Sequence, residues 1–306
     1  MNYIFEPGFF ASGPVHIALA VGTVIAITSA VTGVFTVTRG QSFAGHSLAD
    51  IATTGGSGAF LVGINQFWGY LAFGAGAAAF MEMIGIQRRR GRDVATGVVL
   101  GAALGLAALF LYLGTQYSST TGASFTILFG SMFVLTSSTV PALIVSALLA
   151  LITVLALARP LLLSSLSPDI AAARGVPVRA VGAAYLMALA VAVALSAVII
   201  GAVLSTALLI GPAATALRIA KGPIKATLTA AALGVAATWI GIVLAYDSYY
   251  WPPSHRGWPV SFFVVTLVVL AYLVTYFRPD RPPQHHHQHA QHAHDTQDAE
   301  PACSRP

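Results

Sequence analysis

Nine apolar segments, each close to the length that crosses a membrane, follow one another along most of this chain of 306 residues. They fall at 14–37, 44–64, 67–86, 95–115, 141–162, 181–200, 203–220, 226–246 and 260–277. A helix needs about 20 apolar residues to cross the hydrocarbon core of a bilayer. The pattern therefore predicts an all-α fold, a polytopic transmembrane helical bundle of about 8–9 spans. The apolar stretch 126–135 is too short to cross and is a candidate re-entrant segment, and a break between two spans is expected at Gly201.

The composition agrees with a chain whose main solvent is lipid. Hydrophobic residues make up 57% of the chain and charged residues only 8%, whereas soluble domains carry about 25% charged residues. So few charges cannot cover a surface that faces water. The sequence also has no GxxxxGK[ST], HExxH or GxSxG motif, which are the signatures of P-loop ATPases, zinc proteases and α/β-hydrolases. An intramembrane enzyme therefore has no recognisable catalytic constellation here.

Basic residues gather in alternate connections between the predicted spans. Of the 15 Lys and Arg residues, only Arg256 lies in a connection on the other side. Because loops rich in Lys and Arg stay in the cytoplasm, we expect the N-terminus outside the plasma membrane and the C-terminus inside. The net charge of +5 thus reflects membrane topology, and we expect no nucleic-acid partner.

The chain divides into three parts by composition. Residues 1–13 form an N-terminal outer segment, 14–277 the transmembrane domain, and 278–306 a polar, disordered, His-rich cytoplasmic tail. This tail is expected to bind divalent ions weakly through six histidines: His285, His286, His287, His289, His292 and His294.

Two of the ten carboxylates fall inside the apolar segments, at Asp50 and Glu82. A carboxylate near the bilayer centre costs roughly 2.5–3.5 kcal/mol, so it marks a candidate functional site. Glu82 lies near the arginines Arg88 and Arg89, and we expect it to pair with one of them. Asp50 has His46 four residues before it, on the same face of a helix. The two side chains offer the nitrogen and oxygen ligands that zinc or manganese accepts, or they hydrogen-bond each other to stabilise the helix end.

Asp247 stands beside an aromatic cluster in the outer connection that contains Tyr246, Tyr249, Tyr250 and Trp251. We expect it to be a solvated loop acid, with the entrance of a pathway as the alternative. The glycines of TTGGSGAF, which follow Asp50 along the chain, provide room for close helix packing or for irregular backbone. Irregular backbone within the membrane is tolerated only where it lines a cavity or is buried in protein.

The cytoplasmic connection after 141–162 contains a short predicted helix. Ser167 suits its N-cap, Pro168 its first position, Asp169 its first turn and Gly175 its end. With Ala171 and Val176, this segment resembles the coupling segment of metal-ion ABC permeases, the zinc/manganese-type membrane subunits. The resemblance extends over about residues 14–277. It includes the run from Leu208 to Ala216 (LLIGPAATA), LFG at 128–130 followed by Ser131 where an acid is usual, and the pair Tyr246–Asp247.

The same resemblance bears on His46 and Asp50. The family pattern reads Gly-Asp-x-Leu-Ser/Ala-His, whereas this chain reads Gly45-His46-Ser47-Leu48-Ala49-Asp50. The acid and the imidazole have exchanged places. Because both ligand types remain on one helix face, the resemblance implies that a metal path survives here with altered geometry.

The resemblance implies a permease subunit that imports a divalent metal cation, zinc first and manganese next, with no permanently bound cofactor. Two copies would line one pathway, and each would dock an ABC ATPase subunit through a coupling helix at 167–179. An external metal-binding protein would deliver the ion. The alternative is a stand-alone secondary carrier or efflux protein driven by an ion gradient. Such a carrier needs several coupled intramembrane acids, and this chain offers only Asp50 and Glu82.

Overall fold

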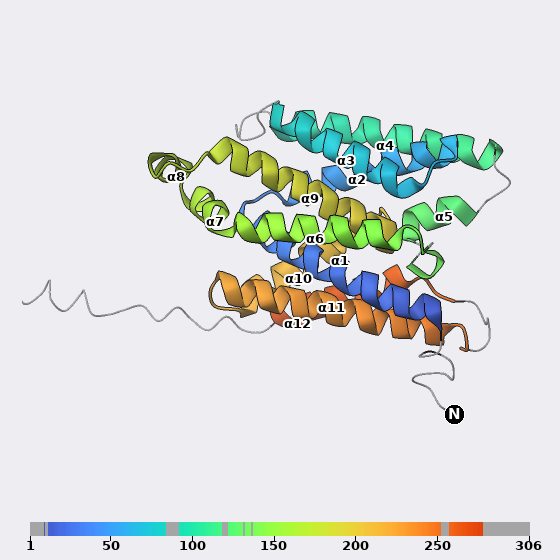
Figure 1. Ribbon diagram of the computed structural model, residues 1–306. Helices are drawn as coiled ribbons and strands as arrows, with labels where there is room; N and C mark the ends of the chain where they lie inside the picture. Colours follow the sequence, from blue (N-terminus) through green and yellow to red (C-terminus); the bar gives the residue numbers. More distant parts are fainter. Residues whose placement is uncertain are drawn as a thin grey trace, which may run out of the picture. The chain divides into compact units, whose positions relative to one another are not determined.

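The structure is a computed structural model that describes residues 9, 12–83, 92–117, 122–130, 132–135, 137–251 and 257–277. Every regular element in these ranges is helical (Figure 1), which confirms the all-α prediction. In chain order the elements are α1 (Gly13–Thr38), α2 (Ser42–Val62), α3 (Gln66–Met83), α4 (Arg92–Tyr117), α5 (Gly122–Phe129), the 3-10 helix η2 (Met132–Val134), α6 (Val140–Ala156), α7 (Ala158–Leu166), α8 (Pro168–Ala173), α9 (Val178–Ile200), α10 (Ser205–Ile219), α11 (Pro223–Ser248) and α12 (Val260–Tyr276).

Each of the nine apolar segments corresponds to one helix, except that 141–162 forms the pair α6 and α7, bent by 54°. Among the described residues, α1, α9, α11 and the Gly97–Tyr117 part of α4 are long and apolar enough to cross a membrane. The pair α6–α7 makes a fifth span if it crosses as one, and α10 and α12 are shorter apolar helices. The chain is therefore a helical bundle that crosses the membrane several times.

Residues 1–275 form one compact unit, and α1 and α9 lie at its centre. Helix α1 contacts α6, α9, α10 and α11, while α9 also contacts α2, α3 and α6. Figure 1 shows α2, α3 and α4 on one side of these two helices and α10, α11 and α12 on the other. The two central helices therefore join the halves of the unit.

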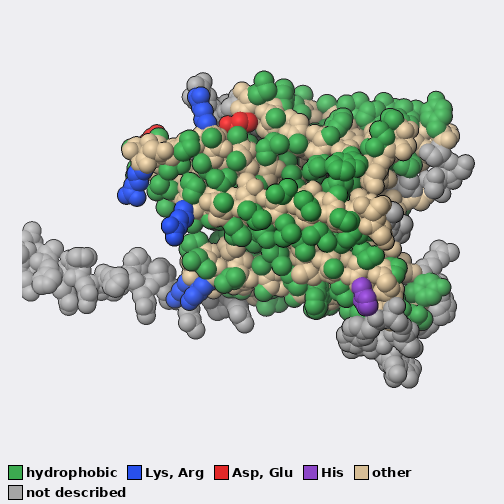
Figure 2. All heavy atoms as spheres, in the orientation of Figure 1, with side chains coloured by type: hydrophobic (Ala, Val, Ile, Leu, Met, Phe, Trp, Pro, Cys, Tyr) green, Lys and Arg blue, Asp and Glu red, His purple; other side chains and the backbone are tan. Residues whose placement is uncertain are grey.

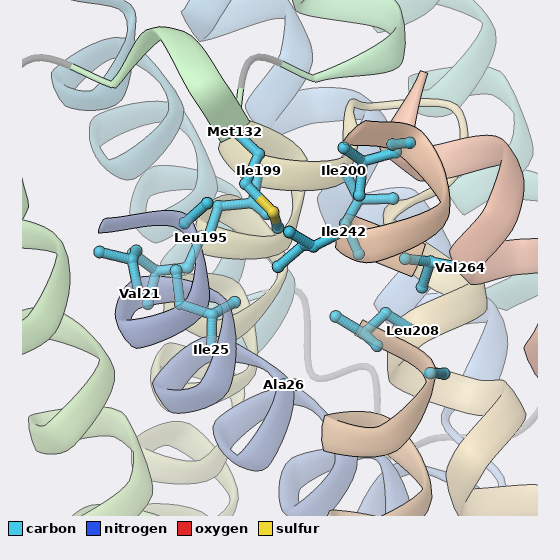
Figure 3. Close-up of a cluster of buried hydrophobic side chains, with 14 of the residues drawn as sticks. Val21, Ile25, Ala26, Met132, Leu195, Ile199, Ile200, Leu208, Ile242 and Val264 are labelled. Carbon is cyan, nitrogen blue, oxygen red and sulfur yellow. The ribbon is translucent and has the colours of Figure 1, made fainter. Parts of the chain in front are cut away.

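Apolar side chains from helices on both sides of α1 and α9 meet in one core cluster (Figure 3). Its members include Val21 and Ile25 of α1, Leu195 and Ile199 of α9, Leu208 of α10, Ile242 of α11 and Val264 of α12. Many buried positions between the helices are alanine. Small residues allow helix backbones to approach closely, which is how helices associate within a membrane.

A seam of buried hydroxyl groups also ties α1 to α9. The Oγ atoms of Ser29 and Ser196 lie 2.6 Å apart, and Thr36 Oγ1 lies 2.7 Å from the hydroxyl of Tyr185. Buried hydroxyls need hydrogen-bond partners because lipid supplies none. The seam therefore fixes how α1 and α9 sit against each other along much of their length.

The expected break at Gly201 is present and packs against the short segment 126–135. Helix α9 ends at Ile200, and Gly201 takes a φ of +93°. Gly130, at the end of α5, takes a φ of +85°. A Cβ atom on either glycine would collide with backbone of the other segment. The backbone N–H of Ala202 donates to the carbonyl oxygen of Ile127, at 3.1 Å. The predicted break at Gly201 and the candidate re-entrant segment 126–135 therefore pack directly against each other.

Basic side chains gather at one end of the bundle, the end that carries α8 (Figures 1 and 2). The described Lys and Arg residues whose side chains are placed are Arg39 after α1, Arg159, Arg174 and Arg179 around α7 to α9, and Arg218, Lys221 and Lys225 around the α10–α11 turn. The segregation of charge is therefore a property of the fold, while the side of the membrane it faces stays a prediction.

Candidate functional site

The candidate metal pair, His46 and Asp50, lies near the start of α2. The turn at Gly40 (φ +64°) reverses the chain after α1, and α2 begins at Ser42. The Nε2 atom of His46 lies 3.5 Å from Oδ2 of Asp50. The side chain of His46 is 48% exposed and that of Asp50 only 10%. The predicted pairing on one helix face is thus present, with the carboxylate set deeper in the protein than the imidazole.

Beyond Asp50, α2 continues with a run of buried hydroxyls and glycines. Thr54 donates through Oγ1 to the carbonyl oxygen of Ala103 on α4, at 2.7 Å. A Cβ at Gly55 would collide with the carbonyl oxygen of Gly69 on α3, and one at Gly56 with the ring of Tyr70. The glycines therefore serve close packing, and α2 stays helical to Val62. Irregular backbone, the other use foreseen for them, is absent from this helix.

Within the described residues, no three His, Cys, Asp or Glu side chains are grouped so that they could hold a metal ion. His46 and Asp50 bring one nitrogen and one oxygen donor close together. Two donors cannot form a closed four-ligand cage of the kind that structural zinc sites use. The arrangement is suited to contacting an ion in passing.

The weaker candidates lie elsewhere in the fold. Glu82 is partly buried near the end of α3, and its expected partners Arg88 and Arg89 lie outside the described residues. The six histidines of the tail lie outside them too, so its metal binding stays a prediction.

Asp247 differs from its expected state. It is only 3% exposed, in the last turn of α11, instead of being a solvated loop acid. Its Oδ1 atom has no hydrogen-bond partner among the described residues. The helix continues beyond the apolar segment, and this places the carboxylate inside the bundle. The ring of the adjacent Tyr246 packs edge-on against Phe9, with centroids 5.2 Å apart.

The predicted coupling segment forms α8, with the expected residues at its ends. Ser167 has extended backbone, and its Oγ accepts a hydrogen bond from the N–H of Ile170 at 3.4 Å. Gly175 takes a φ of +78°, and the N–H of Val176 donates to the carbonyl oxygen of Ala171 at 3.0 Å. This is the Schellman arrangement that ends a helix.

Helix α8 spans only Pro168–Ala173 and is therefore shorter than the predicted coupling helix 167–179. The left-handed conformation at Gly175 stops it, and Pro177 precedes the first residue of α9. Two apolar side chains near this helix are exposed, Leu166 at the end of α7 at 87% and Ile170 of α8 at 54%.

Arg39, which in the sequence served only as a marker of topology, makes specific contacts. Its Nη1 donates to Ser164 Oγ at 2.9 Å and to the carbonyl oxygen of Leu161 at 3.4 Å. A signal was available, since Arg39 follows a helix in which Thr28, Thr32 and Thr36 recur every four residues. That spacing predicts a polar stripe, but not the helix that the stripe faces.

Residues 14–277 match the ABC 3 transport family. The chain belongs to this family. It is therefore a multi-pass membrane subunit of a transport system and not an enzyme, and the family recognised from the sequence is confirmed.

Curated relatives cover most of the chain. It is 31% identical to the manganese import system permease protein ScaB of Streptococcus parasanguinis, over 75% of this chain and 81% of that protein. It is 29% identical to the manganese transport system membrane protein MntC of Listeria innocua, over 79% of this chain and 85% of that protein.

The fold is similar to that of PsaBC from Streptococcus pneumoniae, solved in complex with Fab. The TM-score is 0.74 at 24% identity, covering 89% of this chain and 94% of that chain. At this identity the likeness establishes the fold alone.

Proposed function

We propose that this chain is the membrane-spanning permease of an ABC transporter that imports a divalent metal ion, manganese or zinc. The observation that carries the proposal is the pair His46–Asp50, 3.5 Å apart near the start of α2, in a chain of the ABC 3 transport family. Nitrogen and oxygen donors of this kind accept both metals. Two relatives named for manganese support manganese as the first ion to test.

Two donors per chain leave most coordination positions of the ion open. Two copies of the chain lining one pathway would bring a second pair, and water would occupy the remaining positions. Weak coordination suits an ion that must be released at the other side of the membrane. Asp247 and Glu82 remain weaker candidates for contact with the ion along its path.

The energy for uphill import comes, in this proposal, from a separate ATPase subunit that docks on the segment around α8. The exposed apolar side chains of Leu166 and Ile170 lie at the end of the bundle where basic residues gather. A contiguous exposed apolar patch outside the membrane is typical of a protein contact, and in this proposal Leu166 and Ile170 belong to such a patch. The basic end of the bundle then faces the cytoplasm, and the C-terminus lies inside the cell. An external metal-binding protein delivers the ion at the opposite end.

Metal uptake by cells tests the proposal. The chain is expressed with its ATPase and binding protein in cells that lack their own manganese and zinc importers, and uptake of each radioactive ion is measured. Asp50→Ala should reduce uptake by at least about tenfold, since even disturbing an outer-shell partner of a metal ligand has this effect. The matched control is Ser47→Ala on the same helix, because the Ser47 hydroxyl donates within its own helix, to the carbonyl oxygen of Phe43 at 2.9 Å.

Uptake by Asp50→Ala at the rate of the wild type, with the variant present in the membrane, would refute a role for this pair in the ion path. Loss of uptake in both variants would indicate damage to α2 and not loss of a metal donor. Comparison of the two radioactive ions identifies the preferred metal.

A further inference from the structure

Arg39 joins three helices at the basic end of the bundle. It follows the last residue of α1, and its Nη1 donates to the Oγ of Ser164 and to the carbonyl oxygen of Leu161, both on α7. Its guanidinium carbon lies 5.4 Å from the centroid of the Tyr185 ring on α9. The hydroxyl of Tyr185 lies 2.7 Å from Thr36 Oγ1 on α1. One side chain therefore connects α7 to the hydroxyl seam between the central helices.

The partners of this guanidinium are neutral. The one contact between an acidic and a basic side chain within ion-pair distance in the described ranges is His46–Asp50, so Arg39 has no carboxylate partner there. A hydroxyl, a carbonyl oxygen and an aromatic face hold a cation in a fixed geometry. Without an opposing charge, these contacts can break and form again more readily than a buried ion pair.

The place of α7 in the chain gives this contact its significance. Helix α7 lies between the bend after α6 and the short helix α8, so it connects the proposed ATPase docking segment to the bundle. Leu161 and Ser164 are buried on its inner side, whereas Leu166 at its end is exposed. A force applied at α8 reaches α9 directly, because α9 follows α8 along the chain, and it reaches α1 through the inner side of α7, where Arg39 is bound.

We propose that Arg39 is a positioning residue that transmits movement of α7 and α8 to α1 and α9 during transport. This inference rests on the proposed function, because it presupposes an ATPase that moves α8. The hydrogen bonds of Arg39 go to the inner side of α7, and none goes to the metal pair or to the exposed side of α8 in the described residues. In this role Arg39 makes α1 and α9 move together with α7 and α8.

The turn that carries Arg39 also holds a hydrogen-bond donor and an acceptor that are both unused, so Arg39 has an alternative partner. The Nε of Arg39 and the Oε1 of Gln41 are both buried without a hydrogen-bond partner among the described residues. One is a donor and the other an acceptor, and leaving either unpaired is unfavourable. A displacement of this turn that lets the Nε of Arg39 donate to the Oε1 of Gln41 offsets the loss of the hydrogen bond from Arg39 to Ser164. Gln41 is the N-cap of α2, so the exchanged arrangement acts on the helix that holds His46 and Asp50.

The test uses the complete complex of this chain with its ATPase and binding protein in proteoliposomes. The quantity measured is the number of metal ions transported per ATP hydrolysed. Ser164→Ala should lower this ratio by about tenfold, the factor that loss of one hydrogen bond to a charged group produces. Arg39→Ala removes every contact of the guanidinium and should lower the ratio at least as much. Arg39→Lys should restore part of it, since an ammonium group can still donate to Ser164. ATPase affinity should stay unchanged in all variants, because none of these groups lies on the exposed side of α8.

The matched control is Ser165→Ala, one residue further along α7. The Ser165 hydroxyl donates to the carbonyl oxygen of Leu161 at 2.6 Å, within its own helix. It shares this acceptor with Arg39, but only the Ser164 hydroxyl accepts a hydrogen bond from Arg39 itself. The ratio for this variant should equal that of the wild type. An unchanged ratio in Arg39→Ala, or an equal loss in Ser165→Ala and Ser164→Ala, overturns the inference. A wild-type complex that hydrolyses ATP and moves no metal overturns the proposed function instead, so the two failures are distinguishable.

Discussion

His46 and Asp50 occupy different environments although they lie one helical turn apart. The imidazole is about half exposed, with 48% of its side chain accessible, while the carboxylate is 10% exposed. A deep carboxylate gains much from a divalent ion, because a buried charge needs a partner. An exposed imidazole can turn toward or away from the same ion. We therefore expect Asp50 to contribute most of the affinity and His46 to contribute to capture and release.

Exchanging His46 and Asp50 tests whether metal uptake depends on the types of donor present or on their order along α2. The double variant His46→Asp/Asp50→His keeps one imidazole and one carboxylate on the same face and restores the order of the family pattern. His46→Asp alone gives two acids, and Asp50→His alone gives two imidazoles. We expect metal uptake by the double variant to exceed uptake by either single variant by about tenfold, the effect of regaining a matched metal partner. A double variant no better than the singles would show that each position demands its own residue.

For individual residues, the sequence predicted contacts within one helix, but it did not predict contacts or burial that depend on distant helices. The spacing of His46 and Asp50 indicated their shared face, because a helix fixes residues four apart. The partners of Arg39 lie more than 120 residues away along the chain, and no local pattern identifies them. The burial of Asp247 was missed for the same reason, since other helices cover it.

At the level of helices, α2 approaches α3 closely at two glycines. A Cβ at Gly69 of α3 would collide with backbone at Gly55 of α2, whereas one at Gly76 of α3 would meet no atom within 4 Å. Gly69→Ala should lower the free energy of unfolding by about 1–3 kcal/mol, the usual cost of overpacking. Gly76→Ala should not lower it, and should raise it by about 0.5–1 kcal/mol, because alanine favours a helix over glycine. Denaturant titration of the purified variants in detergent measures both, and equal stabilities would contradict the close approach of the two helices.

Two glycines with positive φ allow a second comparison, Gly175 at the end of α8 and Gly40 in the turn between α1 and α2. Gly175 has a φ of +78° and Gly40 a φ of +64°, and a Cβ at either would lie in open space. Alanine at each position should therefore impose only the backbone cost of about 1–2 kcal/mol. Gly175→Ala should weaken binding of the ATPase subunit by about tenfold, and Gly40→Ala should leave it unchanged. Affinity measurement with the purified subunits checks this, and equal effects would place the ATPase contact elsewhere.

The elements themselves were largely predictable, because the length of an apolar run sets the length of a transmembrane helix. The break at Gly201 followed from glycine chemistry in the same way. The ends of α8 at Ser167 and Gly175 were predicted from residue type and are confirmed, whereas the boundary at residue 179 for the coupling helix was too long. The bend between α6 and α7 was missed although Pro160 signals it. A proline cannot donate to the carbonyl four residues earlier, here that of Ala156, the last residue of α6.

For the whole molecule, orientation in the membrane is the largest untested expectation. The chain has a single cysteine, Cys303, so a membrane-impermeant maleimide reports on the tail directly. We expect labelling in inside-out vesicles and none in intact cells. In a Cys303→Ser background, Asn65→Cys in the exposed α2–α3 turn should give the opposite result. Labelling of Cys303 from outside the cell would reverse the topology derived from the basic residues.

The central claim is that a separate ATPase drives a divalent metal ion through this chain past His46 and Asp50. Its most direct test is uptake of radioactive manganese and zinc by proteoliposomes that hold the purified chain, with and without the ATPase subunit, the binding protein and ATP. We predict saturable uptake only when all three are present, and its loss in Asp50→Ala. Uptake driven by a proton gradient in vesicles without the ATPase would contradict the claim and identify a secondary carrier.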